Sequence, residues 1–217
     1  MLIEWLSIFA ALLITLSGVL ILMAEDWRVS IGLLAVQYLG VFTLTAVEWP
    51  LGMAITRLVA GWIAGAVLGM AMLSLPETSP TQNDIEGATA PLSAPPRRFH
   101  LSPGDAPNPI FLILSAALVG LAVISQTPRL MNWIPNLEAA QAWGGLILIG
   151  LGLLKMGFHS QPLHVILGLL LFFSGFELLY LALSAALLTA ALSAAVTLTI
   201  SLTGAYLLLA PHMEANE

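Results

Sequence analysis

The chain contains seven stretches of apolar residues, each close to the roughly 20 residues that an α-helix needs to cross a bilayer. Only 8% of its residues are charged, against about 25% in a soluble domain, so it cannot cover a water-facing surface. The sequence therefore predicts an all-α, polytopic integral membrane protein with about seven transmembrane helices. The predicted spans are Leu2–Met23, Val29–Val47, Pro50–Leu73, Pro109–Ser125, Ala139–Gly157, Pro162–Ala185 and Leu187–Ala210.

One long segment lacks this apolar character. Residues 75–108 are rich in Pro, Ser, Thr and Gly, a composition that cannot bury enough apolar surface to fold by itself. We expect an extramembrane linker there. It divides the chain into a three-span bundle over residues 1–74 and a four-span bundle with a short C-terminal tail over residues 109–217.

Lysines and arginines in the loops predict the orientation, because cytoplasmic loops carry an excess of them. Arg28, Arg97, Arg98 and Lys155 fall on one side of the predicted topology, and Arg129 falls on the other. We expect the N-terminus outside and the C-terminus in the cytoplasm, in the cell's inner or plasma membrane. The first residues, "MLIEWLSIF", lack the positively charged region with which a signal peptide begins, so they indicate a first transmembrane span.

Two pairs of spans suggest an internal repeat. "RVSIGLLAVQYLGVF" in the second span aligns with "LHVILGLLLFFSGFE" in the sixth, matching Gly32 to Gly168. "GMAITRLVAGWIAGAVL" in the third aligns with "SAAVTLTISLTGAYLL" in the seventh. The first three and last three spans could therefore be two parallel copies of a three-helix unit, although apolar helices also align by chance.

Several functional classes are excluded. The chain has no cysteine, which rules out disulfides and thiolate-held metals or clusters. Its net charge of −6 argues against nucleic acid as a partner. We find no nucleotide-binding, nucleophile-elbow or zinc-protease motif, and the histidines lie at the membrane edge, in the linker or in the tail. We predict no catalytic site, metal or cofactor.

Two charges lie inside predicted spans. Glu177 in "FFSGFELLYL" and Arg57 in "AITRLVAGW" are costly there, at about 2.5–3.5 kcal/mol or more for a charge at the bilayer centre. Counted along their spans, both lie roughly 10–12 Å below the outer surface, so we expect them to pair. Glu177 could handle protons or be a structural carboxyl, and Arg57 could instead reach the interface along its stem.

Basic residues gather around the loop between the fifth and sixth spans. Lys155 ends one span, His159 lies in the loop and His164 begins the next. Lys155 and His164 are candidate proton-loading groups, since histidine titrates near neutral pH. Basic residues at cytoplasmic span ends are also expected for topology alone.

Uncharged polar and small residues point mainly to helix packing. Gly61, Gly65 and Gly69 form two overlapping G-x-x-x-G steps that let another helix approach the third span. Hydrogen bonds between helices are expected from the polar residues Gln37, Tyr38, Thr197, Thr199, Ser201 and Thr203.

These stretches resemble a known family. "WRVSIGLLAVQYLGVF", "AITRLVAGWIAGAVL" and "LHVILGLLLFFSGFELLYLAL" look like the E subunit of hydrogenase-4, whose C-terminal half resembles the three-span K subunit of respiratory complex I. The family carries a cation in the third helix of its front part, and Arg57 resembles it. The family's basic loop followed by an acid-bearing span resembles "KMGFHSQPLHVILGLLLFFSGFE" in this chain. The chain departs from this pattern at two positions. The K subunit carries its first membrane glutamate directly after a Gly-Leu pair, where this chain has Leu170. The second membrane glutamate of the K subunit has no counterpart in the seventh span of this chain.

The resemblance implies a membrane-arm subunit of an energy-converting complex, with other membrane subunits as partners and a contribution to proton translocation carried by Glu177 and Arg57. Two alternatives remain open. One is a purely structural or assembly subunit of another respiratory or photosynthetic complex. The other is a small-solute transporter, which an inverted repeat would favour.

Overall fold

Seven α-helices make up the computed structural model over the residues it describes, which are 2–75, 108–135, 137–183 and 187–214. All seven are long and apolar enough to cross a membrane, which confirms the predicted all-α membrane fold. In chain order they are α1 (Leu2–Met23), α2 (Trp27–Glu48), α3 (Leu51–Ser74), α4 (Pro109–Trp133), α5 (Ala139–Phe158), α6 (Pro162–Leu181) and α7 (Leu187–Glu214).

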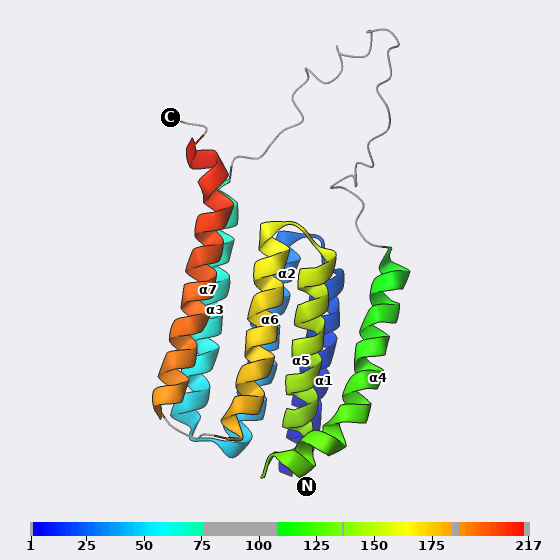
Figure 1. Cartoon of the computed structure of the whole chain (residues 1–217). Helices are drawn as coiled ribbons and strands as arrows, with labels where there is room; N and C mark the ends of the chain where they lie inside the picture. Colours follow the sequence, from blue (N-terminus) through cyan, green and yellow to red (C-terminus); the bar gives the residue numbers. More distant parts are fainter. Residues whose placement is uncertain (1, 76–107, 136, 184–186, 215–217) are drawn as a thin grey trace.

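The helix bounds differ most from prediction in the second half of the chain. The helix α4 continues eight residues beyond the predicted Ser125 and passes through Pro128, near where its ribbon bends (Figure 1). Proline removes one backbone hydrogen bond and kinks a helix without always ending it. Arg129 is therefore part of a helix and not of a loop. Conversely, α6 ends at Leu181, four residues before the predicted Ala185.

The helices form two stacked layers. α1, α2 and α3 lie in one layer, and α5, α6 and α7 lie in front of them, so that α1 faces α5, α2 faces α6 and α3 faces α7 (Figure 1). The fourth helix, α4, stands at the edge of the bundle beside α5. Facing helices run in the same direction because each helix of the second layer comes four helices later in the chain than the one it faces. The order and direction of the helices are those expected of a parallel three-helix repeat.

Both halves of the chain contribute to one apolar core. Fully buried Ile14 of α1 and Leu34 of α2 belong to the same cluster as Leu148 and Leu167 of the second half. The three-span and four-span segments are thus packed together as a single bundle. Most of the predicted linker, residues 76–107, lies outside the described residues.

The suggested equivalence of Gly32 and Gly168 does not extend to their surroundings. A Cβ atom at Gly32 would meet nothing within 4 Å, whereas one at Gly168 would lie 2.8 Å from the Gly152 carbonyl oxygen. Only Gly168 therefore lies at a close helix contact.

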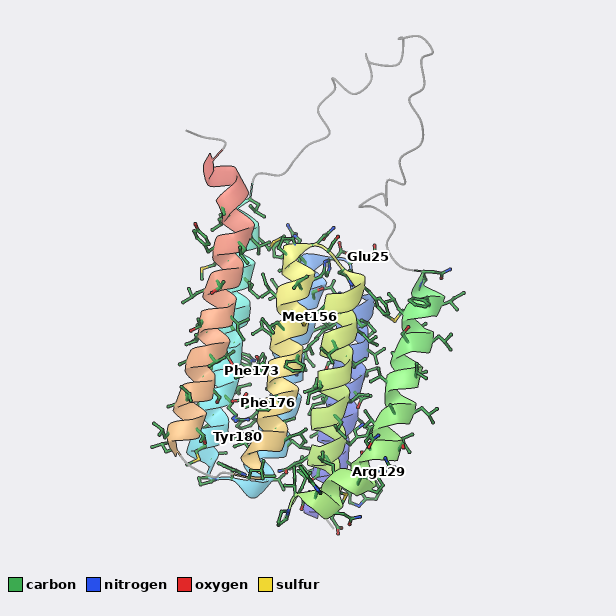
Figure 2. The ribbon with its side chains drawn as sticks, viewed as in Figure 1. Glu25, Arg129, Met156, Phe173, Phe176 and Tyr180 are labelled. Carbon is green, nitrogen blue, oxygen red and sulfur yellow. The ribbon has the colours of Figure 1, made fainter. Side chains whose placement is uncertain are left out.

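The orientation of the bundle remains a prediction with a direct measurement. Glu25 and Arg129 mark opposite ends of the helices (Figure 2). A reporter enzyme fused after Glu217 should be active in the cytoplasm, and one inserted between α4 and α5 should report the outside. The reverse pattern of activities would overturn the predicted orientation.

Candidate functional site

A buried ion pair joins α3 to α6. The Nη2 atom of Arg57 lies 2.8 Å from Oε1 of Glu177, and their side chains are only 4% and 6% exposed. The two intramembrane charges are therefore partners, as their similar inferred depth predicted. Arg57 does not extend to the interface, because its guanidinium is directed at Glu177 and is buried.

The pair lies nearer to one end of the bundle than the sequence predicted. Arg57 is about two turns from the start of α3, and Glu177 is four residues from the end of α6. At 1.5 Å rise per residue these depths are roughly 9 and 6 Å from the respective helix ends. The earlier end of α6 explains the difference for Glu177.

Hydroxyl groups from α2 and α7 surround the pair. Buried Tyr38 is close enough to interact electrostatically with both charges. The Thr197 hydroxyl is within hydrogen-bonding range of the Tyr38 hydroxyl. The Ser193 hydroxyl is within the same range of the Glu177 carboxylate. Since these groups can share the charge of the carboxylate, the pair sits in a local polar region that four helices build.

A crevice between α6 and α7 leads to this pair. Its volume is about 210 Å³, and Arg57 and Glu177 form part of its lining. Three aromatic side chains of α6, Phe173, Phe176 and Tyr180, lie on the side towards α7 (Figure 2). The opposite wall comes from α7 and consists of Thr189, Leu192, Ser193 and Val196.

Lys155 caps the C-terminal end of α1. Its Nζ donates to the carbonyl oxygens of Ile21 at 2.7 Å, Ala24 at 3.0 Å and, at the longer distance of 3.4 Å, Leu22. Ile21 and Leu22 belong to the last turn of α1 and Ala24 follows directly after it, at a helix end where carbonyls lack intrahelical partners and a cation is favoured. The structure thus gives this completely buried lysine a stabilising role that the sequence does not indicate.

The two histidines next to Lys155 lie against each other. The rings of His159 and His164 are 4.6 Å apart between centroids and are tilted by 31°. Burial, followed by the positive charge of Lys155, holds the pKa of His159 below its usual value. The ring of His159 is therefore neutral at pH 7, and the loop does not present a permanent positive cluster.

An apolar section separates the two polar ends along α6. Leu167, Leu170 and Leu171 are completely buried and stand between His164 and Ser174. Beyond this section, one turn before Glu177, Ser174 Oγ accepts a long hydrogen bond of 3.5 Å from Gln37 Nε2 of α2.

We expect Lys155→Met to destabilise the fold by about 3 kcal/mol, because an unsatisfied buried hydrogen-bonding group costs about 1–3 kcal/mol. Thermal unfolding of the detergent-solubilised chain measures this loss. Arg28→Met is the control: Arg28 is exposed and stacks on the Trp27 ring at 5.2 Å, a contact of about 0.5–1 kcal/mol. Equal losses in both variants would contradict the capping role.

A very close approach of α5 and α6 involves four glycines that the sequence did not single out as packing positions. A Cβ atom at Gly152 would lie 2.6 Å from the Gly168 carbonyl oxygen, and one at Gly175 would lie 2.5 Å from the Gly145 carbonyl oxygen. These two pairs join α5 to α6 with their backbones nearly in contact. Within each helix the glycines are seven residues apart, a spacing that places them on one face and could have revealed them.

On α3 the close approach is limited to one of the three predicted glycines. A Cβ atom at Gly61 would overlap the Tyr38 ring, whereas at Gly65 and Gly69 it would make ordinary contacts of 3.8 and 3.7 Å with Ile31. The predicted G-x-x-x-G surface therefore faces α2, and only its first glycine is sterically required.

The described part of the chain contains no group of three or more histidines and carboxylates that could hold a metal ion. Comparisons with protein-family models, curated proteins and solved structures gave no significant match. The resemblance to hydrogenase-4 and complex I subunits therefore stays a prediction.

Proposed function

We propose that the chain is a membrane-arm subunit of a multi-subunit energy-converting complex related to complex I or the group 4 hydrogenases. The observation that carries the proposal is the buried Arg57–Glu177 pair, with Nη2 and Oε1 2.8 Å apart. Ionisable residues inside a membrane bundle are costly and usually face an interior where they serve an ion path or hold helices together. The pair joins α3 to α6, and its burial is compatible with either role.

The surface of the bundle supports a role among other membrane subunits. α4 and α7 are the least buried helices, and their exposed side chains include Phe111, Leu118, Leu188, Leu192 and Tyr206. Such faces suit either lipid or the helices of neighbouring subunits. A subunit that fills space in a membrane arm requires extended surfaces of this kind and no catalytic site of its own.

A contribution to proton translocation would use Glu177 as the exchangeable group. A carboxyl can bind and release a proton, while the guanidinium of Arg57 keeps its charge and the hydroxyls of Tyr38 and Ser193 can relay hydrogen bonds. Lys155 is engaged by the end of α1 and His164 is itself buried, so proton loading by either group stays part of the proposal.

The buried leucines of α6 favour a second candidate function. Leu167, Leu170 and Leu171 leave no polar side chain of α6 between His164 and Ser174. A chain with this interruption would serve as a structural subunit of the complex and leave proton movement to its partners.

Glu177→Gln in the assembled complex separates the two candidates. Subunit assembly is measured by gel electrophoresis of the intact complex, and proton uptake is measured in vesicles. Normal assembly with lost proton uptake supports translocation through Glu177. Impaired assembly supports the structural role, and normal assembly with normal uptake contradicts both roles for this residue.

A further inference from the structure

The crevice between α6 and α7 has a buried polar floor and aromatic walls. Of the Arg57 guanidinium nitrogens, Nη2 contacts Glu177, whereas Nε and Nη1 are buried and have no hydrogen-bond partner within the described protein. A buried N–H group without a partner is unusual in a folded protein. Arg57, which helps to line the crevice, therefore has two buried donors for which the described chain supplies no acceptor.

The walls of the crevice continue to the membrane-facing surface. Phe176 is 49% exposed and Tyr180 is 42% exposed, and their rings stack at 6.0 Å between centroids. Leu192, on the opposite wall, is also exposed. The entrance is thus apolar and lies on the outside of a transmembrane bundle, where a molecule dissolved in the bilayer meets it before any aqueous solute does.

Depth and size restrict the occupant further. Arg57 and Glu177 lie within about 6–9 Å of helix ends, near the boundary where the hydrocarbon core gives way to the polar headgroup region. A volume of about 210 Å³ is smaller than the roughly 300–1,000 Å³ of small-molecule pockets. Only part of a ligand fits inside, so the remainder stays in the bilayer.

We propose that this crevice binds a phospholipid, with an ester carbonyl oxygen accepting a hydrogen bond from Arg57 and an acyl chain lying along Phe173, Phe176 and Tyr180. The carbonyl is the acceptor that Nε and Nη1 lack. An uncharged acceptor also suits the site, because Glu177 already balances the charge of Arg57. This inference does not depend on the proposed function in proton translocation.

Native mass spectrometry of the full-length chain tests the proposal. The chain is reconstituted in phosphatidylcholine bilayers that also contain a long-tailed benzoquinone, whose carbonyls offer the same acceptor, and is then released into detergent. We expect one phosphatidylcholine to remain bound per chain. Retention of the quinone in its place, or of neither molecule, would overturn the proposal.

Three variants locate the bound lipid. Val196→Phe places a ring in the crevice and should lower lipid retention at least fivefold. Leu202→Phe makes the same kind of addition at an exposed position of α7 outside the crevice, and it should leave retention unchanged. Arg57→Lys keeps a cation for Glu177 but removes the planar donors, so retention should again fall. Unchanged retention in Val196→Phe or Arg57→Lys would refute binding at this place.

Discussion

Replacing Gly152 by leucine should leave little folded protein. The Cβ atom alone would lie 2.5 Å from the Phe172 backbone nitrogen and 2.6 Å from the Gly168 carbonyl oxygen. Both are backbone atoms that cannot turn aside as a side chain can. The helices α5 and α6 would have to separate, which also opens the neighbouring Gly145–Gly175 contact. Overpacking typically costs about 1–3 kcal/mol, and we expect this backbone clash to cost more than that.

Gly157→Leu is the matched control for this prediction. Gly157 lies five residues further along α5, and a Cβ atom there would meet nothing within 4 Å. The gain in helix propensity on replacing glycine, about 0.8–1.0 kcal/mol for alanine and nearly as much for leucine, applies to interior Gly152 and is smaller at Gly157, one residue from the end of α5. The yield of monodisperse protein on size-exclusion chromatography and its thermal midpoint compare the two. Similar behaviour of both variants would show that the close approach of α5 and α6 is dispensable.

The number and type of the helices could be predicted because a single physical requirement determines them. Backbone groups in hydrocarbon must be satisfied within the segment, so a long apolar stretch is helical whatever its neighbours are. The ends of the helices obey weaker rules. The fourth span is predicted to end at Ser125, yet α4 continues through Pro128 and Arg129, since a helix end at the membrane surface can tolerate both.

The pairing of Arg57 with Glu177 could also be predicted, because two opposite charges at similar depth in a membrane lower each other's cost of burial when they are in contact. The role of Lys155 could not. Its partners are the backbone carbonyls of Ile21, Leu22 and Ala24, and a carbonyl at a helix end looks the same in any sequence. Only the packing of α5 against α1 brings Lys155 to these carbonyls.

The pair has a further structural consequence. Arg57 belongs to the layer of α1–α3, and Glu177 belongs to the layer of α5–α7, so their contact joins the two three-helix units. Ser201 Oγ adds another polar link between the layers by donating to the Ala64 carbonyl oxygen at 2.7 Å. Apolar helices in lipid slide on one another easily, and specific polar contacts of this kind fix their relative position.

The largest electrostatic effect is expected when Glu177 is replaced by glutamine. Arg57 would remain buried with its charge unpaired, and arginine cannot lose its proton in a protein. Removing one partner of a buried pair typically costs about 3–5 kcal/mol. The reverse change, Arg57→Met, should cost less, because a lone carboxyl can bind a proton and become neutral. The double variant should lose less than about 2 kcal/mol, since neutral replacements leave no buried charge.

Thermal unfolding of the four proteins in the same detergent gives the coupling energy of the pair. Glu138→Gln is the control for loss of a carboxylate, because Glu138 is exposed at the N-terminus of α5, where a negative charge contributes about 0.3–1 kcal/mol. The expected order of stability is wild type, double variant, Arg57→Met and then Glu177→Gln. If the losses of the two single variants simply add in the double variant, the ion pair does not hold α3 to α6. A Glu177→Gln variant no less stable than Glu138→Gln would show that water or lipid relieves the charge of Arg57 when its partner is gone.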